Sequence, residues 1–260
     1  MNPDWLVPQW PAPAHVHAVC TTRAGGTSVT PYDSLNLGDH VGDSPEAVAA
    51  NRAILQQEIG GVQPVFLTQV HDTQVVRLSG STAQGTQADG CITDQPRVAC
   101  TIMVADCLPV LLTNEQGSWV AAAHAGWRGL VGPGGQGILE NVVECFSALA
   151  PVGPTQDASK IIAWLGPCIG PESFEIGDDV RDAFVAHDPA ALTLFTSQAS
   201  GKWLADLPGL ARLRLAALGV TQIYGNDGSR AWCTVSQPSR FFSYRRDHVS
   251  GRMAACIWRD

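Results

Sequence analysis

The sequence predicts an α+β protein of one domain, with mixed sheets and helices on the outside. Short apolar segments and amphipathic segments interleave along the chain, which indicates alternating strands and helices. Turn sequences recur between the strands, so a purely parallel sheet is not expected. At 260 residues the chain approaches the upper limit of one hydrophobic core, and no linker divides it. We therefore expect a single domain over residues 1–260.

Helices are predicted where capping residues precede apolar periodicity. Ser44, Pro45 and Glu46 supply an N-cap, a first-turn proline and a first-turn acid. That helix is expected to end near Glu58, before two glycines. The other expected helices cover residues 138–148, a segment after Gly177, and residues 207–218 with Gly219 as the stop.

Short apolar runs predict strands between these helices. A hairpin turn is expected over residues 114–117, a glycine-rich loop over 129–137 and a polar connection over 150–159. The expected strands are residues 16–22, 65–70, 75–78, 99–104, 110–113, 119–123, 161–165, 222–224 and 253–258.

Composition excludes several classes of partner. A net charge of −8 and a pI near 5.3 argue against binding to nucleic acid or to an anionic membrane, although a small anion can still bind to a few arginines. No apolar run has the length of a membrane helix, and the first residues do not resemble a signal peptide, so we expect a cytoplasmic protein. The eight cysteines are scattered without a C-x-x-C pair, so a metal-binding cysteine would act singly.

Three reactive side chains lie where predicted strands end. His71 follows the run 65–70, Cys107 follows 99–104, with a turn expected at Leu108-Pro109, and His124 follows 119–123. Strand ends share a sheet edge, and two imidazoles with one thiolate would give zinc three ligands and one open position. Two other interpretations remain at this point: structural residues of the core, or a Cys–His nucleophile pair.

Longer motifs around these residues resemble the YfiH-type laccase-domain family. Its members have been called polyphenol oxidase, purine nucleoside phosphorylase and, in some bacteria, peptidoglycan editing factor. The resemblance extends from VPQWPAP (7–13) and SLNLGDH (34–40) to the C-terminus. The motifs that carry it are TQVH (68–71), ADG (88–90), ADCLPVLL (105–112), AAHAGWRGL (122–130), LGPCIGP (165–171), FEIG (174–177) and FFSYRRD…GR (241–252).

The resemblance implies a four-layer α-β-β-α sandwich with mixed sheets. It also implies a single metal ion bound by the histidine of TQVH, the cysteine of ADC and the histidine of AHAGWRG, which are His71, Cys107 and His124 here. The chain departs from the family pattern after Leu130, where residues 131–136 are inserted. A longer loop at the rim of the site would affect substrate access.

The number of histidines limits the possible chemistry. The chain has seven, with one H-x-H pair at His15 and His17, which is too few for the four coppers of a multicopper oxidase. One copper at Cys107 remains possible. The signature of zinc base deaminases, H-x-E with P-C-x-x-C, is absent, so an acid/base residue for adenosine deamination would have to be Asp106 or Glu175. The alternative role for Asp106 is to orient a ligand histidine.

Phosphorolysis requires an anion site and a nucleoside pocket. Arg128, four residues beyond His124, is the first candidate for phosphate, and together with Asp106 and Glu175 it completes the expected catalytic set. The expected substrate-binding residues are Arg23 beside a glycine pair, Asn36 and Asp89 for substrate hydroxyls, and Arg245 and Arg246 after an aromatic run.

The expected function is therefore that of a zinc-dependent purine nucleoside phosphorylase acting on adenosine and inosine, with adenosine deaminase activity. We expect one Zn²⁺ per chain, with Cu²⁺ as the alternative. The expected partners are a purine nucleoside and phosphate, with no nucleic acid or membrane, in a monomer or weak homodimer. The alternative functions are copper-dependent polyphenol oxidation and peptidoglycan editing on a muropeptide precursor.

Overall fold

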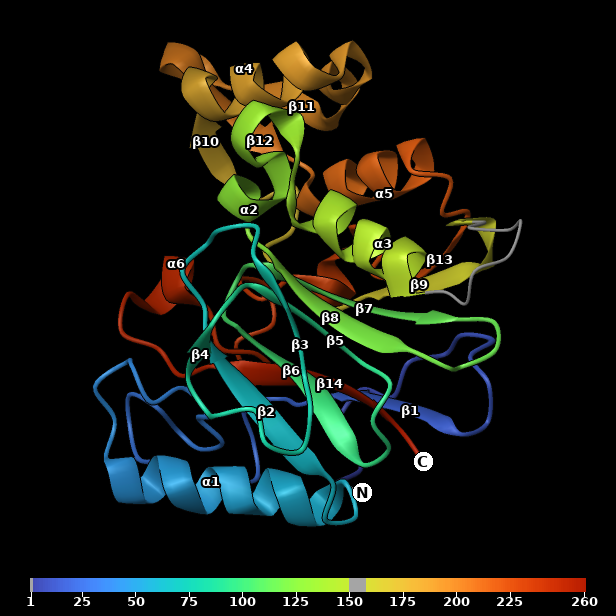
Figure 1. Ribbon diagram of the computed structural model, residues 1–260. Helices are drawn as coiled ribbons and strands as arrows, with labels where there is room; N and C mark the ends of the chain where they lie inside the picture. The colour runs from blue at the N-terminus through green and yellow to red at the C-terminus, as the bar shows by residue number, and fades with distance from the viewer. Residues whose placement is uncertain (1, 150–157) are drawn as a thin grey trace.

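Two packed β-sheets form the centre of the protein, and helices cover their outer faces (Figure 1). The computed structural model describes residues 2–149 and 158–260. Most of the polar connection expected at 150–159 lies outside the described residues. Within the described part of the chain, no helix has both the length and the apolar character needed to cross a bilayer.

The first sheet has the strand order β1-β14-β6-β2-β4. Helix α1 (Pro45–Glu58) lies along its outer face, where Leu55 packs with Phe66 and Met103. Its N-cap is Ser44, whose side chain accepts a hydrogen bond from the backbone of Ala47, as the sequence predicts. The strands are β1 (Val16–Cys20), β14 (Met253–Arg259), β6 (Val98–Val104), β2 (Gln63–Thr68) and β4 (Thr86–Gln87).

The second sheet has the order β13-β9-β7-β8-β5-β3, and helices α3 (Ile138–Leu149) and α5 (Leu207–Ala217) cover its outer face. Apolar side chains such as Ile102, Leu111 and Trp164 fill the space between the sheets. The predicted four-layer α-β-β-α sandwich with mixed sheets is thus confirmed. Its strands are β13 (Gln222–Gly225), β9 (Ile161–Leu165), β7 (Leu108–Asn114), β8 (Val120–Ala125), β5 (Gly90–Thr93) and β3 (Val75–Arg77).

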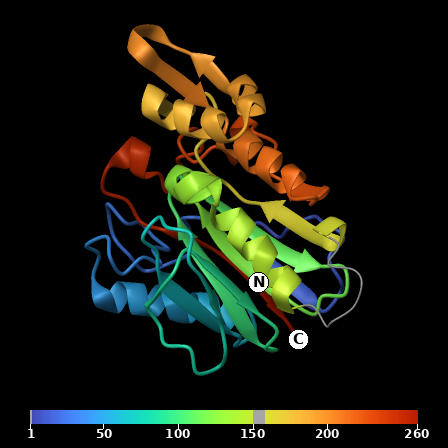
Figure 2. The same ribbon diagram turned by 45° about the horizontal axis from the view of Figure 1, so that its top comes forward.

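A small third sheet lies beyond the sandwich, at the top of Figure 1 and of the turned view in Figure 2. It consists of β10 (Glu175–Gly177), β12 (Lys202–Ala205) and β11 (Phe195–Ser197), and it packs against α4 (Asp178–His187). These strands were not predicted because they are too short to show an apolar period. The remaining elements are α2 (Trp127–Val131), α6 (Tyr244–Asp247) and the 3₁₀ turns at Pro133–Gly135, Ala158–Lys160, Pro189–Leu194, Ala199–Gly201 and Arg230–Trp232.

The predicted helices and strands are all present, with two local corrections. The expected turn at Leu108-Pro109 is wrong: both residues open strand β7, and the chain turns just before them, at 105–107. Proline is tolerated at this position because residue 109 takes part in the hydrogen bond to Gly166 through its carbonyl, which accepts from the Gly166 N–H. No backbone N–H of residue 109 is needed for that bond. The glycine-rich loop also begins later than expected, since helix α2 continues through Val131.

A buried ion pair joins the two helices that cover the second sheet. Arg214 of α5 donates from Nε to the Glu140 carboxylate of α3 at 2.9 Å, and its side chain is only 5% exposed. The other carboxylate oxygen of Glu140 accepts from the backbone of Gly137, and Arg214 also bonds the carbonyl of Gly135. The pair therefore also fixes the loop between α2 and α3.

Replacing Arg214 by methionine should destabilise the fold strongly, because it leaves the Glu140 carboxylate buried without a cationic partner. We expect a loss of about 3–5 kcal/mol in the free energy of unfolding, measured in urea. The control is Arg77→Met, which removes an exposed pair with Asp94 and should cost less than about 1 kcal/mol. Equal losses in the two variants would contradict this role for Arg214.

Candidate metal centre

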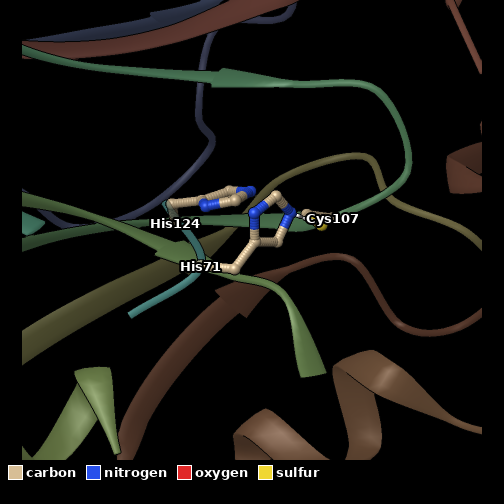
Figure 3. A group of neighbouring side chains, drawn as sticks. All are labelled: His71, Cys107 and His124. Carbon is tan, nitrogen blue, oxygen red and sulfur yellow. Dashed lines mark hydrogen bonds between the residues drawn. The ribbon is translucent and has the colours of Figure 1, made fainter. Parts of the chain in front are cut away.

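His71, Cys107 and His124 meet at one place in the structure, although they are far apart in the sequence (Figure 3). Their potential ligand atoms all lie within 4.8 Å of one another, and Cys107 Sγ is 3.8 Å from His71 Nε2. His124 is buried, Cys107 is half-buried and His71 is exposed. The cluster is therefore held from within the protein and open on one side.

Each of the three side chains comes from a different part of the sandwich. His71 follows β2 of the first sheet, and His124 lies inside β8 of the second sheet. Cys107 lies on the turn from β6 to β7, where the chain crosses from one sheet to the other. The centre therefore spans the junction between the two sheets.

The buried carboxylate of Asp89 holds both histidines. Its Oδ1 accepts from Nδ1 of the His124 ring at 2.8 Å and from the backbone N–H of His71 at 2.9 Å. Its Oδ2 accepts from the backbone N–H groups of Val70 and Asp72. Burial alone would raise the pKa of Asp89, but the hydrogen bonds from His124 and the backbone outweigh it and lower the pKa. With Nδ1 engaged in this way, Nε2 of His124 is the nitrogen available to a metal.

The segment that carries His71 is fixed on its other side by Gln69. This side chain donates to the carbonyl of Met103 and accepts from its backbone N–H, both at 2.8 Å, so it continues the pairing of β2 with β6. His71 itself has a φ of +63°, a left-handed conformation that is uncommon for a residue with a side chain. The hydrogen bonds to Asp89 and from Gln69 hold the chain in this conformation.

Gly126 leaves space for the cluster. A Cβ atom at this position would lie 2.9 Å from Cys107 Sγ and 3.2 Å from the His71 ring. Because those contacts are too close, any larger residue would displace the potential ligands. The glycine of the sequence AHAGW is therefore required by the packing of the site.

The electrostatics of the cluster favour a thiolate. Burial raises the pKa of the Cys107 thiol, but the charge of His124 and hydrogen bonds from His124 and His71 exceed that effect and lower the pKa to about 6. Conversely, burial lowers the pKa of His124, whereas the Cys107 charge and the Asp89 hydrogen bond raise it to about 9. Without a metal, the pair is a thiolate beside an imidazolium, and a cation bound there would replace the imidazolium proton.

The donor set fits a zinc ion. Zinc–nitrogen bonds of about 2.0–2.1 Å and zinc–sulfur bonds of about 2.3 Å at tetrahedral angles imply a nitrogen–sulfur separation of roughly 3.6 Å. The observed 3.8 Å between Cys107 Sγ and His71 Nε2 is close to this value. Copper also binds two imidazoles and one thiolate, so the ligands alone do not select the metal.

A cavity of about 490 Å³ opens over the cluster. Its walls are partly apolar and aromatic, with Trp127, Phe174 and Tyr244 among them, which suits a planar organic substrate. The lining consists of His40, Gln69, His71, Met103, Val104, Ala105, Asp106, Cys107, His124, Trp127, Arg128, Ile169, Phe174, Leu207, Tyr244, Arg245 and Arg252.

The structure brings three of the other sequence-predicted residues to this cavity. Arg128 is exposed, and its guanidinium lies 4.4 Å from the centre of the Trp127 ring. Asp106 accepts from the Thr234 hydroxyl and from the backbone N–H of Arg245, which ties the Cys107 turn to helix α6. Arg245 also donates to the carbonyl of Glu175.

The remaining predicted residues lie outside the cavity lining. Arg23 pairs with Asp33 and bonds the carbonyl of Pro238, and Arg246 bonds backbone carbonyls and Asp247. The side chain of Asn36 is buried and bonds Gly38, Asp43 and the backbone of Arg252. Glu175 is exposed on β10. Asp89, expected at a substrate hydroxyl, instead orients His124, which is the role considered for Asp106.

Sequence reasoning missed two basic residues of the cavity, His40 and Arg252. His40 is the last residue of the motif SLNLGDH, and Arg252 is the last residue of the motif FFSYRRD…GR near the C-terminus. Neither follows a predicted strand in the manner of the three cluster residues. Arg252 precedes β14, and its place beside Cys107 depends on the pairing of β14 with β6.

Comparison with known proteins finds relatives that match nearly the whole chain. The chain is 48% identical over 255 residues to the purine nucleoside phosphorylase YfiH of Escherichia coli K12, covering 97% of this chain and 98% of the relative. It is 47% identical over 261 residues to a purine nucleoside phosphorylase of Haemophilus influenzae, covering 99% and 98%.

Solved structures share the fold over the same length. A Neisseria meningitidis protein superposes with a TM-score of 0.89 at 47% identity, covering 99% of both chains. YlmD from Geobacillus stearothermophilus superposes with a TM-score of 0.87 at 31% identity, covering all of this chain and 97% of that one. The model of the family described as multi-copper polyphenol oxidoreductase laccase matches residues 17–260. The chain therefore belongs to this laccase-like family, the family of YfiH.

Proposed function

We propose that the protein is a zinc-dependent purine nucleoside phosphorylase that acts on adenosine and inosine. The observation that carries the proposal is a three-ligand cluster, open on one side, at the base of a cavity with aromatic walls and three arginines. The names of the Escherichia coli and Haemophilus influenzae relatives support the same reaction. In this reaction a phosphate oxygen bonds to C1′ of the ribose, the bond from C1′ to the purine nitrogen breaks, and the base leaves with a proton.

We assign His71, Cys107 and His124 as the metal ligands. A zinc ion with three protein ligands supplies a Lewis acid and can activate water. Residues of the cavity lining would bind the purine and the anionic group. We propose that the purine packs among Trp127, Phe174 and Tyr244, and that Arg128 and Arg245 act on the anionic group.

Asp106 is the better placed of the two candidate acid/base residues. It lines the cavity next to Cys107, whereas Glu175 is exposed on β10 and does not line it. Asp106 has a φ of +96°, and hydrogen bonds from Thr234 and from the backbone of Arg245 hold its carboxylate in place. We propose that this carboxylate accepts the proton that the attacking phosphate releases and passes it to the purine nitrogen.

Adenosine deamination is proposed as a second reaction of the same site, in which water replaces the 6-amino group and ammonia leaves. The observation that favours it is the open side of the cluster, because a three-ligand zinc site lowers the pKa of water. Phenol oxidation with a single copper fits the same ligands less well. In the described part of the chain, the cluster offers ligands for one metal ion, whereas reduction of dioxygen to water takes four electrons.

The reaction is tested with purified, zinc-loaded protein, adenosine or inosine, and phosphate. Chromatography should show hypoxanthine and ribose-1-phosphate from inosine, and adenine, ribose-1-phosphate and inosine from adenosine. Omitting phosphate should stop phosphorolysis but leave deamination. If none of these products forms with protein that contains one zinc per chain, the nucleoside function is wrong.

The role of Asp89 is tested with Asp89→Asn. The amide places an N–H group against the donors of residues 70–72 or of His124, so we expect metal affinity to fall about 10- to 100-fold. Affinity is measured by competition with a chelator, with elemental analysis of the same samples. Cys107→Ser should lose the metal, whereas Asp72→Asn, at an exposed neighbour of His71, should keep it. Unchanged affinity in Asp89→Asn would refute the role.

A further inference from the structure

The cavity over the metal cluster contains more cationic groups than its carboxylate can neutralise. Arg128, Arg245 and Arg252 line it, and among the described lining residues Asp106 is the one carboxylate. Both oxygens of Asp106 are already bonded, to Thr234 and to the backbone of Arg245. No ion pair with an acidic side chain is found for these three arginines in the described part of the chain. Other arginines do form such pairs: Arg23, Arg52, Arg77, Arg181, Arg214 and Arg246.

Arg252 is the most enclosed of the three. Its side chain is half-buried, whereas Arg128 and Arg245 are exposed. Its backbone N–H bonds the buried amide of Asn36, and its aliphatic stem packs so closely on Gly38 that a Cβ there would lie 2.7 Å from Cγ. The guanidinium therefore has a fixed position at the cavity wall, with its centre 5.9 Å from that of the Tyr244 ring.

The hydrogen bonds of Arg252 leave one edge of the guanidinium for a ligand. Nη1 donates to the carbonyls of Ser250 at 2.8 Å and Gly251 at 3.1 Å. No acceptor for Nε or Nη2 is found among residues 2–149 and 158–260. These two nitrogens form the edge of a guanidinium that binds carboxylate or phosphate oxygens in pairs.

The enclosure of this cation has a cost that an anion would offset. Burial lowers the pKa of Arg252. The nearby negative groups, Cys107 and Asp106 foremost, oppose this shift through their charge, but they form no hydrogen bond with the guanidinium. A metal ion bound to Cys107 would oppose the negative charge of the thiolate, and the thiolate would then compensate Arg252 less. His40, also in the lining, does not supply a negative charge.

We propose that Arg252 is the principal oxyanion-binding residue of the cavity, with Nε and Nη2 holding two oxygens of the phosphate that enters phosphorolysis. The identity of the anion rests on the proposed phosphorylase function, whereas the existence of an anion site rests on the contacts of Arg252. Arg128 and Arg245, which are both exposed, make weaker contacts with the same anion.

The first test uses zinc-loaded full-length variants and inosine. In Arg252→Met we expect the KM for phosphate to rise about ten- to a hundred-fold, as for the loss of a charge-assisted contact, and the KM for inosine to stay within about threefold. Arg252→Lys keeps the charge without the paired donors and should fall between methionine and wild type. Arg128→Met should have a smaller effect. Arg230→Met, at an exposed arginine outside the cavity lining, should have none.

A phosphate KM within about twofold of wild type in Arg252→Met, with fold and zinc content intact, overturns the proposal. If Arg252→Met does not fold, Arg252→Lys takes its place, and a phosphate KM within about twofold of wild type in Arg252→Lys overturns the proposal. The second test uses the unaltered protein: phosphate should slow the modification of Arg252 by phenylglyoxal, but not that of Arg230, as measured by peptide mass spectrometry. Equal modification with and without phosphate also overturns the proposal.

The two tests separate the anion site from the nucleoside reaction. Protection of Arg252 by phosphate without any phosphorolysis would support the anion site and refute the proposed function. Phosphorolysis that does not depend on Arg252 would support the function and refute the site.

Discussion

The buried carboxylate of Asp89 is the constraint on which the metal centre depends. One side chain accepts four hydrogen bonds, from the ring of His124 and from three consecutive backbone N–H groups around His71. These bonds fix one ligand through its imidazole and the other through its backbone. A carboxylate that accepts this many hydrogen bonds in the protein interior remains ionised, because the hydrogen bonds offset the free-energy cost of removing its charge from water. The open side of the cluster can then face the cavity without loss of order.

The same contacts connect the two sheets of the sandwich. His71 follows β2 of the first sheet. In the second sheet, Asp89 immediately precedes β5 and His124 lies in β8. Cys107 lies between them, on the turn that passes from one sheet to the other. A metal ion bound here would cross-link the sheets at one edge, in addition to its chemistry. The cavity is completed by segments from both ends of the chain, since Arg252 precedes the C-terminal strand β14 and His40 lies before α1.

Much of this arrangement can be predicted from the sequence. The helix caps, the apolar period of the long elements and the placement of His71, Cys107 and His124 at strand ends are local signals, and the structure bears out the elements they predict. The four-layer arrangement follows from the family resemblance. Strands β4, β5, β10, β11 and β12 were missed, because segments of two to four residues seldom show a readable period.

The supporting residues of the site were harder to predict, because their roles depend on contacts between distant segments. Asp89 lies in the turn-like sequence ADG, where an aspartate usually caps a turn, and nothing local indicates that it faces His124, 35 residues further on. Arg252 reaches the cavity only because β14 pairs with β6. Conversely, Arg23 and Arg246 resembled anion-binding residues in sequence, but they make ion pairs and backbone contacts away from the cavity.

We infer that His71, Cys107 and His124 bind one metal ion through two imidazoles and one thiolate. Replacing the metal with Co²⁺ and recording the absorption spectrum tests this claim directly, because a thiolate bound to cobalt gives a charge-transfer band in the near ultraviolet. We predict one equivalent of cobalt, the charge-transfer band of a single thiolate and the visible bands of a four-coordinate ion, all absent in Cys107→Ser. Stoichiometric cobalt binding without the charge-transfer band, or the same band in Cys107→Ser, would contradict the account.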